Sequence, residues 1–311
     1  MKKHLIRRLA QIPVILLGVL ICVFLIIQIS PGDPAVRLAG PSASPELVEQ
    51  IRDELGLNEP LMTQFVDYLK DVCHGDFGKS FSQKTSVAAG VSTAFVNTVY
   101  LIIFARIWSV LAAVPLGIYA ALRQNKPADK ICMNAALLGV SIPEFWLALM
   151  LMYVFCFKLG WLPFSGMGSS MFSWDGFKHA ILPAIMLGLP QMASIARLTR
   201  SEMLEVLRKD YIRTARAKGL RERVVIYKHA LKNASLPLVT IIGTQTGYML
   251  GGSVVIESIF AWPGLGRYSI NAIISSDYPA IQASVLLFAL LFLVVNIIVD
   301  LTLTIVDPRV K

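Results

Sequence analysis

The chain alternates between long apolar runs and shorter polar segments, and six of the runs are long enough to cross a membrane. A helix that rises ~1.5 Å per residue needs about 20 residues to cross ~30 Å of hydrocarbon. The predicted spans cover about residues 12–29, 95–122, 131–157, 180–196, 234–256 and 284–306. The fourth is short and holds Pro183 and Pro190, so we expect its helix to be interrupted. The pattern predicts an all-α membrane protein with six transmembrane helices in one domain over residues 1–311.

A cleaved signal peptide is the competing interpretation of the first run. A basic flank precedes that run, as it does in signal peptides. However, the apolar core is long, and Ser30-Pro31-Gly32-Asp33-Pro34 follows where a cleavage site would have small residues. We therefore expect residues 12–29 to remain as a transmembrane helix.

Two polar segments stand out between the runs. Residues 31–92 are net acidic between Asp33 and Lys84 and contain two amphipathic stretches, 46–55 and 61–72, that predict short helices. Residues 197–232 carry eleven Lys or Arg against four Asp or Glu. Because basic loops stay in the cytoplasm, residues 197–232 and both termini are predicted inside, and residues 31–92 form an extracytoplasmic cap.

Composition supports a lipid environment and argues against nucleic acid as a partner. Apolar residues make up 55% of the chain, charged residues 16%, and the mean hydropathy is +0.63. The net charge of +9 gathers in residues 2–8, 123–130 and 197–232, at the ends of the predicted spans. This distribution indicates contact with membrane lipid and does not resemble a DNA-binding stripe.

The sequence shows no catalytic or metal-binding motif. Gly78-Lys79-Ser80 resembles the end of a phosphate-binding loop, but Cys73 stands where that loop needs a glycine, and the segment is predicted outside. Cys73-His74 supplies two adjacent ligands, too few to close a metal site. We expect neither catalytic residues nor a metal or cofactor bound by this chain.

The basic segment 197–232 contains a predicted helix over residues 211–218, which Gly219 would end with a left-handed cap. One interpretation is a docking surface for a soluble partner, whose movement the helix would transmit to spans four and five. The other is a solvated basic loop that touches anionic lipid headgroups. The chemistry of these residues leaves both interpretations open.

A family resemblance favours docking. The stretches that carry it run along nearly the whole chain: Pro31-Gly32-Asp33-Pro34-Ala35, Leu55-Gly56-Leu57, Gly75-Asp76-Phe77-Gly78, Ser141-Ile142-Pro143, Phe145-Trp146, residues 211–220, His229-Ala230-Leu231-Lys232-Asn233-Ala234-Ser235-Leu236-Pro237, residues 260–267, Asp277-Tyr278-Pro279 and Asp307-Pro308-Arg309. Together they resemble ABC-importer permeases of the dipeptide, oligopeptide and nickel branch. Arg213-Thr214-Ala215 departs from the Glu-Ala-Ala that opens the general importer pattern.

The resemblance implies a type I importer permease in a bacterial inner membrane, with both termini cytoplasmic. Its expected partners are a second, similar permease, two cytosolic ABC ATPases that bind ATP and Mg, and an extracytoplasmic substrate-binding protein. The implied ATPase-coupling residues are Tyr211, Arg213, Thr214, Ala215, Arg216, Ala217, Lys218, Gly219 and Leu220.

Other candidate residues lie in the spans and on the outer side. Arg106 and Glu144 fall deep in predicted spans two and three, where an unpaired charge is costly, so we predict an ion pair along the translocation pathway. Separate snorkelling, or contact with the second permease, is the alternative. Asp33, Trp262, Pro263 and Arg267 are candidates for a gate or a binding-protein contact. The alternative for Trp262-Pro263-Gly264 is a tight turn that places an aromatic ring at the membrane interface.

The predicted function is ATP-driven, binding-protein-dependent import of di- or oligopeptides, with this chain forming half of the pathway. Nickel, free or chelated, and glutathione are the alternative substrates within the same architecture. A self-sufficient secondary transporter is the alternative from another class, but such proteins often show an inverted repeat and membrane carboxylates, and neither is evident. A scaffold that does not transport is a further alternative.

Overall fold

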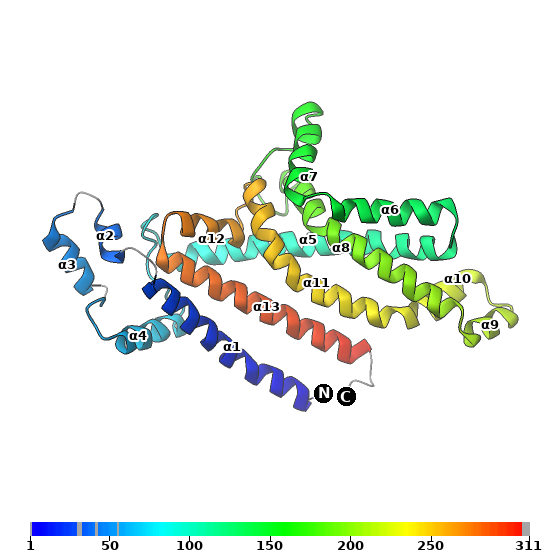
Figure 1. Ribbon diagram of the computed structural model, residues 1–311, viewed down its shortest axis with the longest axis horizontal. Coiled ribbons are helices and arrows are strands. Elements are labelled where there is room, and N and C mark those ends of the chain that lie inside the picture. The colour runs from blue at the N-terminus through cyan, green and yellow to red at the C-terminus, as the bar shows by residue number, and fades with distance from the viewer. Residues whose placement is uncertain (1, 30–32, 41–42, 55, 307–311) are drawn as a thin grey trace. The chain divides into compact units, whose positions relative to one another are not determined.

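The computed structural model describes residues 2–29, 33–40, 43–54 and 56–306, and every regular element in these ranges is a helix (Figure 1). Residues 79 and 86 form an isolated β-bridge, and the described ranges contain no strand. Met1, the Pro31-Gly32 pair, Leu55 and the Asp307-Pro308-Arg309 stretch lie outside the described residues. The predicted all-α class is confirmed.

Five long helices follow five of the predicted spans. They are α1 (Lys2–Ile29), α5 (Val87–Leu122), α8 (Trp174–Leu207), α11 (Leu231–Ile259) and α13 (Tyr278–Val306). Four stretches are long and apolar enough to cross a membrane: 87–122, 174–207, 222–259 and 278–302. The described apolar part of α1, Ala10–Ile26, is shorter.

The third predicted span, 131–157, is not one continuous helix. Its residues form α6 (Pro127–Ser141), α7 (Glu144–Leu151) and a π-helical segment η1 (Met152–Lys158). The chain bends at Ile142, whose extended backbone is the conformation that a following proline imposes. If this bent pair counts as one span, the described residues contain up to five.

The fourth span also differs from its prediction, since α8 continues through both Pro183 and Pro190 for 34 residues. Proline is tolerated inside membrane helices because neighbouring groups and local adjustments of the helix satisfy the freed carbonyls. The expected interruption is therefore absent, and the helix extends well past residue 196 into the basic segment.

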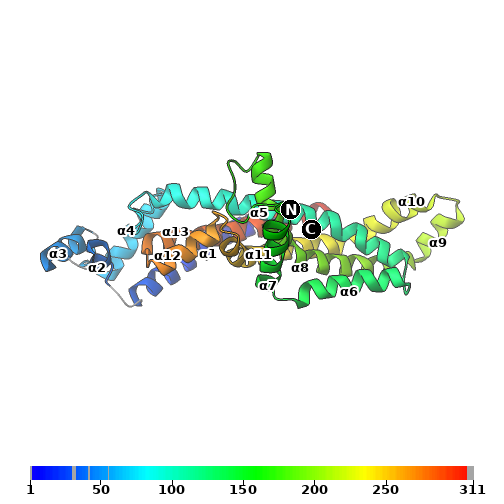
Figure 2. The ribbon, with the colours of Figure 1, turned by 90° about the horizontal axis from the view of Figure 1, so that it is seen from above.

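Contacts divide the chain into two units, and residues 99–262 and 294–306 belong to the first. Within it, α5, α8 and α11 share a core in which Ala113 and Ala196 are fully buried. Small residues let the helices approach closely, and a Cβ at Gly117 would meet Thr199 at 2.5 Å. Helix α6 runs along α8 (Figure 2). The Trp108 indole donates a hydrogen bond to the Ala184 carbonyl at 2.7 Å.

The second unit comprises residues 2–98 and 263–293. Its short helices are α2 (Pro34–Ala39), α3 (Pro45–Glu54), α4 (Leu61–Cys73) and α12 (Leu265–Ile274). The two short helices predicted at 46–55 and 61–72 are confirmed as α3 and α4. The start of α5 packs with α12 and α13 around buried Val87 and Leu265. Phe24 of α1 contacts Phe65 and Tyr68 of α4.

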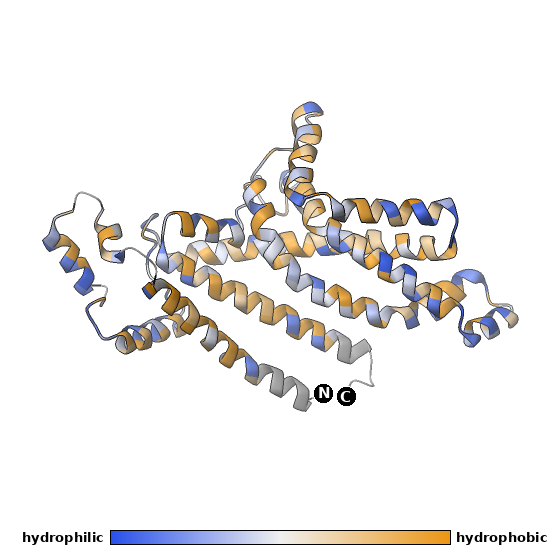
Figure 3. Ribbon diagram, viewed as in Figure 1, coloured by the Kyte–Doolittle hydropathy of each residue, from blue (hydrophilic) through white to orange (hydrophobic). Residues whose placement is uncertain are grey.

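Polar and apolar residues are distributed differently among the helices (Figure 3). The long helices carry mostly apolar residues, and large side chains such as Ile103, Ile107 and Leu111 of α5 are more than half exposed. The short helices α3 and α9 (Asp210–Ala217) carry many hydrophilic residues. Exposed apolar surface on long helices is the pattern expected where lipid or another membrane subunit covers the protein.

Candidate functional site

The basic segment folds into a short helix at the end of α8 (Figure 1). After α8 ends, Arg208 and Lys209 lead into α9, and Gly219 follows with a φ of +74°. A positive φ is readily adopted by glycine and reverses the chain after a helix. The predicted helix and its glycine cap are both confirmed. The chain then continues to α11 through α10 (Glu222–Val224) and η2 (Val225–Ala230).

One face of α9 is anchored in the first unit. Ile212 is fully buried and Ala215 nearly so, and both pack in a cluster with Met203 of α8 and Val225 of η2. The same cluster includes Ile118 and Ala121 near the end of α5, Ala230 at the end of η2 and Ala234 near the start of α11. A displacement of α9 would therefore act directly on the ends of three long helices.

Ile212 anchors α9 by its burial, and the set inferred from family resemblance omits it. Its signal in the sequence is the spacing of two apolar residues, Ile212 and Ala215, at i and i+3 in an otherwise polar helix. Ala215 belongs to the predicted coupling set, but its buried side chain anchors the helix and faces away from solvent.

The other predicted coupling residues form an exposed surface. They are Tyr211, Arg213, Thr214, Arg216, Ala217, Lys218, Gly219 and Leu220. Arg216 donates a hydrogen bond to Glu222 at 2.7 Å, and this bond raises the pKa of the guanidinium above its ordinary value. The exposed positive charge of this surface comes from Arg213 and Lys218, which lie near two exposed apolar side chains, Tyr211 and Leu220.

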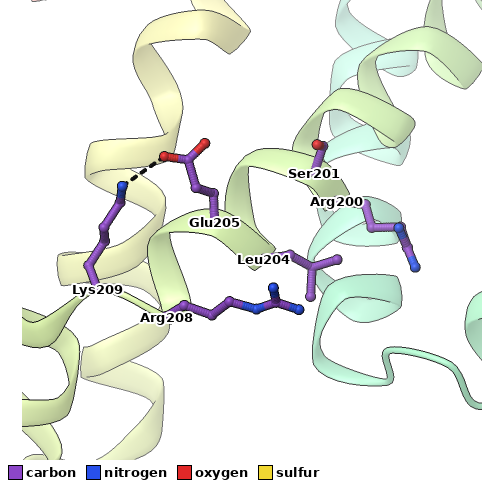
Figure 4. Close-up of a pocket in the computed structure, with 6 residues that line it drawn as sticks. All are labelled: Arg200, Ser201, Leu204, Glu205, Arg208 and Lys209. Carbon is purple, nitrogen blue, oxygen red and sulfur yellow. Dashed lines mark ion pairs between the residues drawn. The ribbon is translucent and has the colours of Figure 1, made fainter.

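A groove of about 410 Å³ lies beside the connection between α8 and α9 (Figure 4). It is lined by Arg200, Ser201, Leu204, Glu205, Arg208 and Lys209. Lys209 pairs with Glu205 at 2.8 Å, whereas Arg208 makes a long hydrogen bond of 3.4 Å to Gln124. The groove and the exposed face of α9 together form a polar, mainly basic surface at one end of the first unit.

A buried ion pair supports this groove. Asp129 of α6 accepts two hydrogen bonds from Arg200 of α8, at 2.5 and 2.6 Å, and a third from the Asn125 backbone at 3.0 Å. The sequence analysis does not single out Asp129, although it is the one acidic residue in the basic stretch 123–130. The pair holds the first turn of α6 against α8.

Arg106 and Glu144 do not form the predicted ion pair in the structure. Nη2 of Arg106 lies 3.0 Å from Sδ of Met249, and its Nε and Nη1 are buried without a hydrogen-bond partner among the described residues. Glu144 is exposed at the first turn of α7. The prediction of an ion pair is therefore wrong for this conformation.

The outer candidates fall in different environments. Asp33 caps α2 through the Ala35 backbone at 2.9 Å and pairs with Arg52 of α3. Trp262 is fully buried in the first unit, where it stacks on Tyr100 with ring centroids 6.1 Å apart. In the second unit, the Pro263 carbonyl accepts a hydrogen bond from Asn97, and Arg267 lies half-buried on α12.

A second acidic residue also has a structural role that the sequence analysis does not assign. Asp277, which precedes α13, accepts hydrogen bonds from the Ser80 hydroxyl, from the Phe81 backbone at 3.1 Å and from the Ser82 hydroxyl at 3.0 Å. In the sequence, Asp277 could be noticed only as part of the Asp277-Tyr278-Pro279 stretch that contributes to the family resemblance. Asp277 fastens the 80–82 turn to the junction of α12 and α13 within the second unit.

Two family models match the chain over its full length. Residues 113–311 match the binding-protein-dependent transport system inner membrane component, and residues 1–113 match the N-terminal part of such membrane components.

Relatives agree with these matches. The dipeptide transport system permease protein DppB of Alkalihalophilus pseudofirmus is 44% identical, with 100% of both chains covered. The glutathione transport system permease protein GsiC is 42% identical in Salmonella choleraesuis and 41% in Escherichia coli K12, with 100% of this chain and 99% of each relative covered.

The fold is also that of a solved transporter subunit. An inward-facing MetNI methionine ABC transporter structure matches with a TM-score of 0.59, at 16% identity, over 70% of this chain and 96% of the other. The likeness supports the type I importer fold that the sequence predicts. The chain therefore belongs to the binding-protein-dependent transport system inner membrane components, as a permease subunit of an ABC importer in the peptide branch.

Proposed function

We propose that this permease imports short peptides, di- or oligopeptides, as one of two similar permease subunits in the complex. The observation that carries the substrate class is the 44% identity to a dipeptide permease over the whole of both chains. Glutathione is the second candidate, because glutathione permeases reach 42% identity over the same length. Glutathione is itself a tripeptide, so one pathway chemistry suits both.

Two cytosolic ATPases are the proposed partners of α9 and the neighbouring groove. The buried side of α9 is held in place by Ile212 and Ala215, while the exposed surface around it presents the cations Arg213 and Lys218 and two apolar residues. Such a helix suits a complementary groove on a soluble partner. ATP and Mg would be bound by these ATPases, and this chain would contribute neither nucleotide binding nor covalent chemistry.

Transport would follow from the way α9 is anchored. When the ATPases close, a pull on α9 reaches α8 and α11 through the shared cluster around Ile212. The two helices would then turn the pathway between inward-facing and outward-facing states, since packed cores move as units and do not deform continuously.

The proposed orientation places the termini and α9 in the cytoplasm of a bacterial cell, with the protein crossing the inner membrane several times. The basic clusters all fall on the cytoplasmic side in this arrangement. Residues 31–92 would form the extracytoplasmic cap that receives a substrate-binding protein. Asp33, Pro263 and Arg267 are candidate contacts with that binding protein on the outer side. Trp262, whose ring is buried, would act on such a contact by supporting the turn around it.

Copurification tests the coupling proposal. The tagged permease, extracted from native membranes in mild detergent, is expected to bring down P-loop ATPases and a second permease. An Arg213→Glu/Lys218→Glu variant reverses two exposed charges of the α9 region, and a Lys79→Glu/Lys84→Glu variant makes the same change on the predicted outer side. We expect the ATPases to be lost from the first variant and retained by the second. Equal ATPase recovery from both variants would refute docking through α9.

Uptake measurements test the substrate. Cells that lack their other peptide importers are given a labelled dipeptide, labelled glutathione or nickel, with and without this permease. Peptide or glutathione uptake that depends on the permease supports the proposal, and the ratio of the two rates ranks the candidates. Uptake of nickel alone would contradict it.

A further inference from the structure

Arg106 lies near the middle of a membrane-spanning helix with most of its hydrogen-bonding capacity unused. At ~1.5 Å per residue, it is ~28 Å from the first residue of α5 and ~24 Å from the last. Its Nη2 contacts the Met249 sulfur at 3.0 Å, and a thioether is a weak acceptor. The Nε and Nη1 donors are buried and have no partner within the described part of the chain.

No carboxylate compensates this charge in the described residues. Glu144, the acidic residue predicted to pair with it, is exposed on α7. The nearby Ser109 hydroxyl donates to the Arg106 backbone carbonyl and leaves the guanidinium unsatisfied. A charged group without a partner inside a membrane is costly and marks a substrate or ion pathway by default.

A second unused polar group lies on the helix that Arg106 contacts. Gln245 precedes Met249 by four residues on α11, so the two side chains occupy the same face of that helix. Its Oε1 atom is buried and has no partner among the described residues.

The two unused groups are complementary to the end of a peptide. A guanidinium offers parallel N–H donors that match a carboxylate. An amide oxygen accepts a hydrogen bond from a peptide N–H. Substrate sites of membrane transporters commonly lie near the bilayer midplane, and Arg106 lies near the middle of the predicted span 95–122.

We propose that Arg106 binds the C-terminal carboxylate of a peptide in transit and that Gln245 accepts a hydrogen bond from the N–H of the same terminal residue. This inference rests on the proposed function, since it requires that the cargo is a peptide with a free carboxylate. Met249, already in contact with the guanidinium, forms the apolar wall of the site.

Photolabelling tests the site directly. The probe is an alanyl-benzoylphenylalanine dipeptide, used as the free acid and as the C-terminal amide, at millimolar concentration on the purified complex without its binding protein. Benzophenone inserts readily at methionine, so the free acid is expected to label the α11 segment around Met249. The amide is expected to label it about tenfold less or weaker still, as the loss of hydrogen bonds to a charged group implies.

Variants complete the test. Arg106→Leu, which removes the charge without adding a methionine, is expected to reduce labelling by the acid to the level of the amide and to leave labelling by the amide unchanged. Arg106→Lys keeps the charge and loses the planar guanidinium. Its labelling by the acid is expected to be weaker than that of the unaltered protein and stronger than that of the variant without a charge at this position. The comparison of acid and amide in the unaltered complex needs no variant, so it stands even if Arg106→Leu fails to fold.

Three results would overturn the inference. They are equal labelling by acid and amide, labelling by the acid that is insensitive to Arg106→Leu, and the absence of labelling on α11. A parallel uptake assay separates this inference from the proposed function. Peptide uptake without carboxylate-dependent labelling would refute the role of Arg106 alone, whereas the absence of any peptide uptake would refute the proposed function.

Discussion

Asp129 shows how a single acidic residue can organise the end of the first unit that carries α9. Its buried carboxylate accepts hydrogen bonds from both Arg200 and the Asn125 backbone. We expect Asp129→Asn to lower the free energy of unfolding by about 1.5–3 kcal/mol, the usual range for hydrogen bonds to charged groups, because Arg200 loses its counter-charge. Arg200 is one-quarter exposed, so water limits the loss.

The measurement for Asp129 is thermal unfolding of the purified permease in detergent. Arg200→Lys is the matched variant, since it keeps the ion pair and loses the two-point contact. It should destabilise less than Asp129→Asn. Unchanged unfolding of Asp129→Asn would show that the pair contributes nothing to stability.

The ion pair of Asp33 predicts that the stability of the contact between α2 and α3 depends on pH. Burial raises the pKa of this carboxyl, but hydrogen bonds from Arg52 and the Ala35 backbone lower it by more, so the pKa lies below its ordinary value of 3.8. A lowered pKa in the folded state stabilises the fold above the unfolded pKa. That stabilisation is lost as the pH falls through the folded value, so the contact between α2 and α3 should loosen below about pH 4.

Hydrogen exchange of α3, corrected for the intrinsic effect of pH, measures this loosening. Protection in the unaltered protein should decline on acidification, and Asp33→Asn should show the weaker protection already at neutral pH. If Asp33→Asn keeps full protection at neutral pH, the link between Asp33 and Arg52 does not stabilise α3.

At this scale the sequence predicts residues whose role is local. Gly219 could be recognised because a helix cap depends on its immediate neighbours. Asp129 and Asp277 could not, since their partners lie 71 and about 196 residues away and depend on the tertiary fold. Arg106 and Glu144 were found as costly charges, but their pairing was mispredicted because depth along two spans does not determine which way each side chain faces.

Among the helices, the contact of α5 with α8 depends on the absence of a side chain. A Cβ at Gly117 would meet Thr199 Cβ at 2.5 Å and the Ala196 carbonyl oxygen at 2.6 Å. Because one of these atoms belongs to the backbone, the helices must move apart to accept a larger residue. We expect Gly117→Val to destabilise the protein by about 1–3 kcal/mol, the usual range for overpacking.

Gly251→Ala is the control for that substitution, because a Cβ there meets nothing within 4 Å. Thermal unfolding should show a lower midpoint for Gly117→Val and little change for Gly251→Ala. Equal midpoints for the two variants would argue against close packing of α5 on α8.

The sequence predicts the existence of the long helices better than their continuity. The length of the apolar run is enough to predict α5, α11 and α13 as membrane-spanning helices. The presence of proline does not by itself predict where a helix breaks. Helix α8 continues through Pro183 and Pro190, where a break was expected, whereas the predicted span 131–157 breaks before Pro143. The difference depends on whether surrounding groups satisfy the freed backbone, and a single sequence does not record those neighbours.

At the scale of the whole molecule, family and class follow from the sequence, while the subunit interfaces do not. The ordered stretches along the chain indicated an importer permease, and the family matches over residues 1–113 and 113–311 confirm it. Surfaces that another subunit covers look like lipid-facing surfaces in sequence, since both are apolar. The partner of each exposed apolar face is therefore beyond what this chain alone can specify.

The central claim is that this permease moves peptides only when cytosolic ATPases drive it through α9. The most direct test is uptake of a labelled dipeptide into proteoliposomes that contain the full complex, its binding protein and ATP. We predict ATP-dependent accumulation with the unaltered permease and with Lys79→Glu/Lys84→Glu, and none with Arg213→Glu/Lys218→Glu. Uptake that persists without the ATPases, or that is unaffected by the α9 variant, would contradict the account.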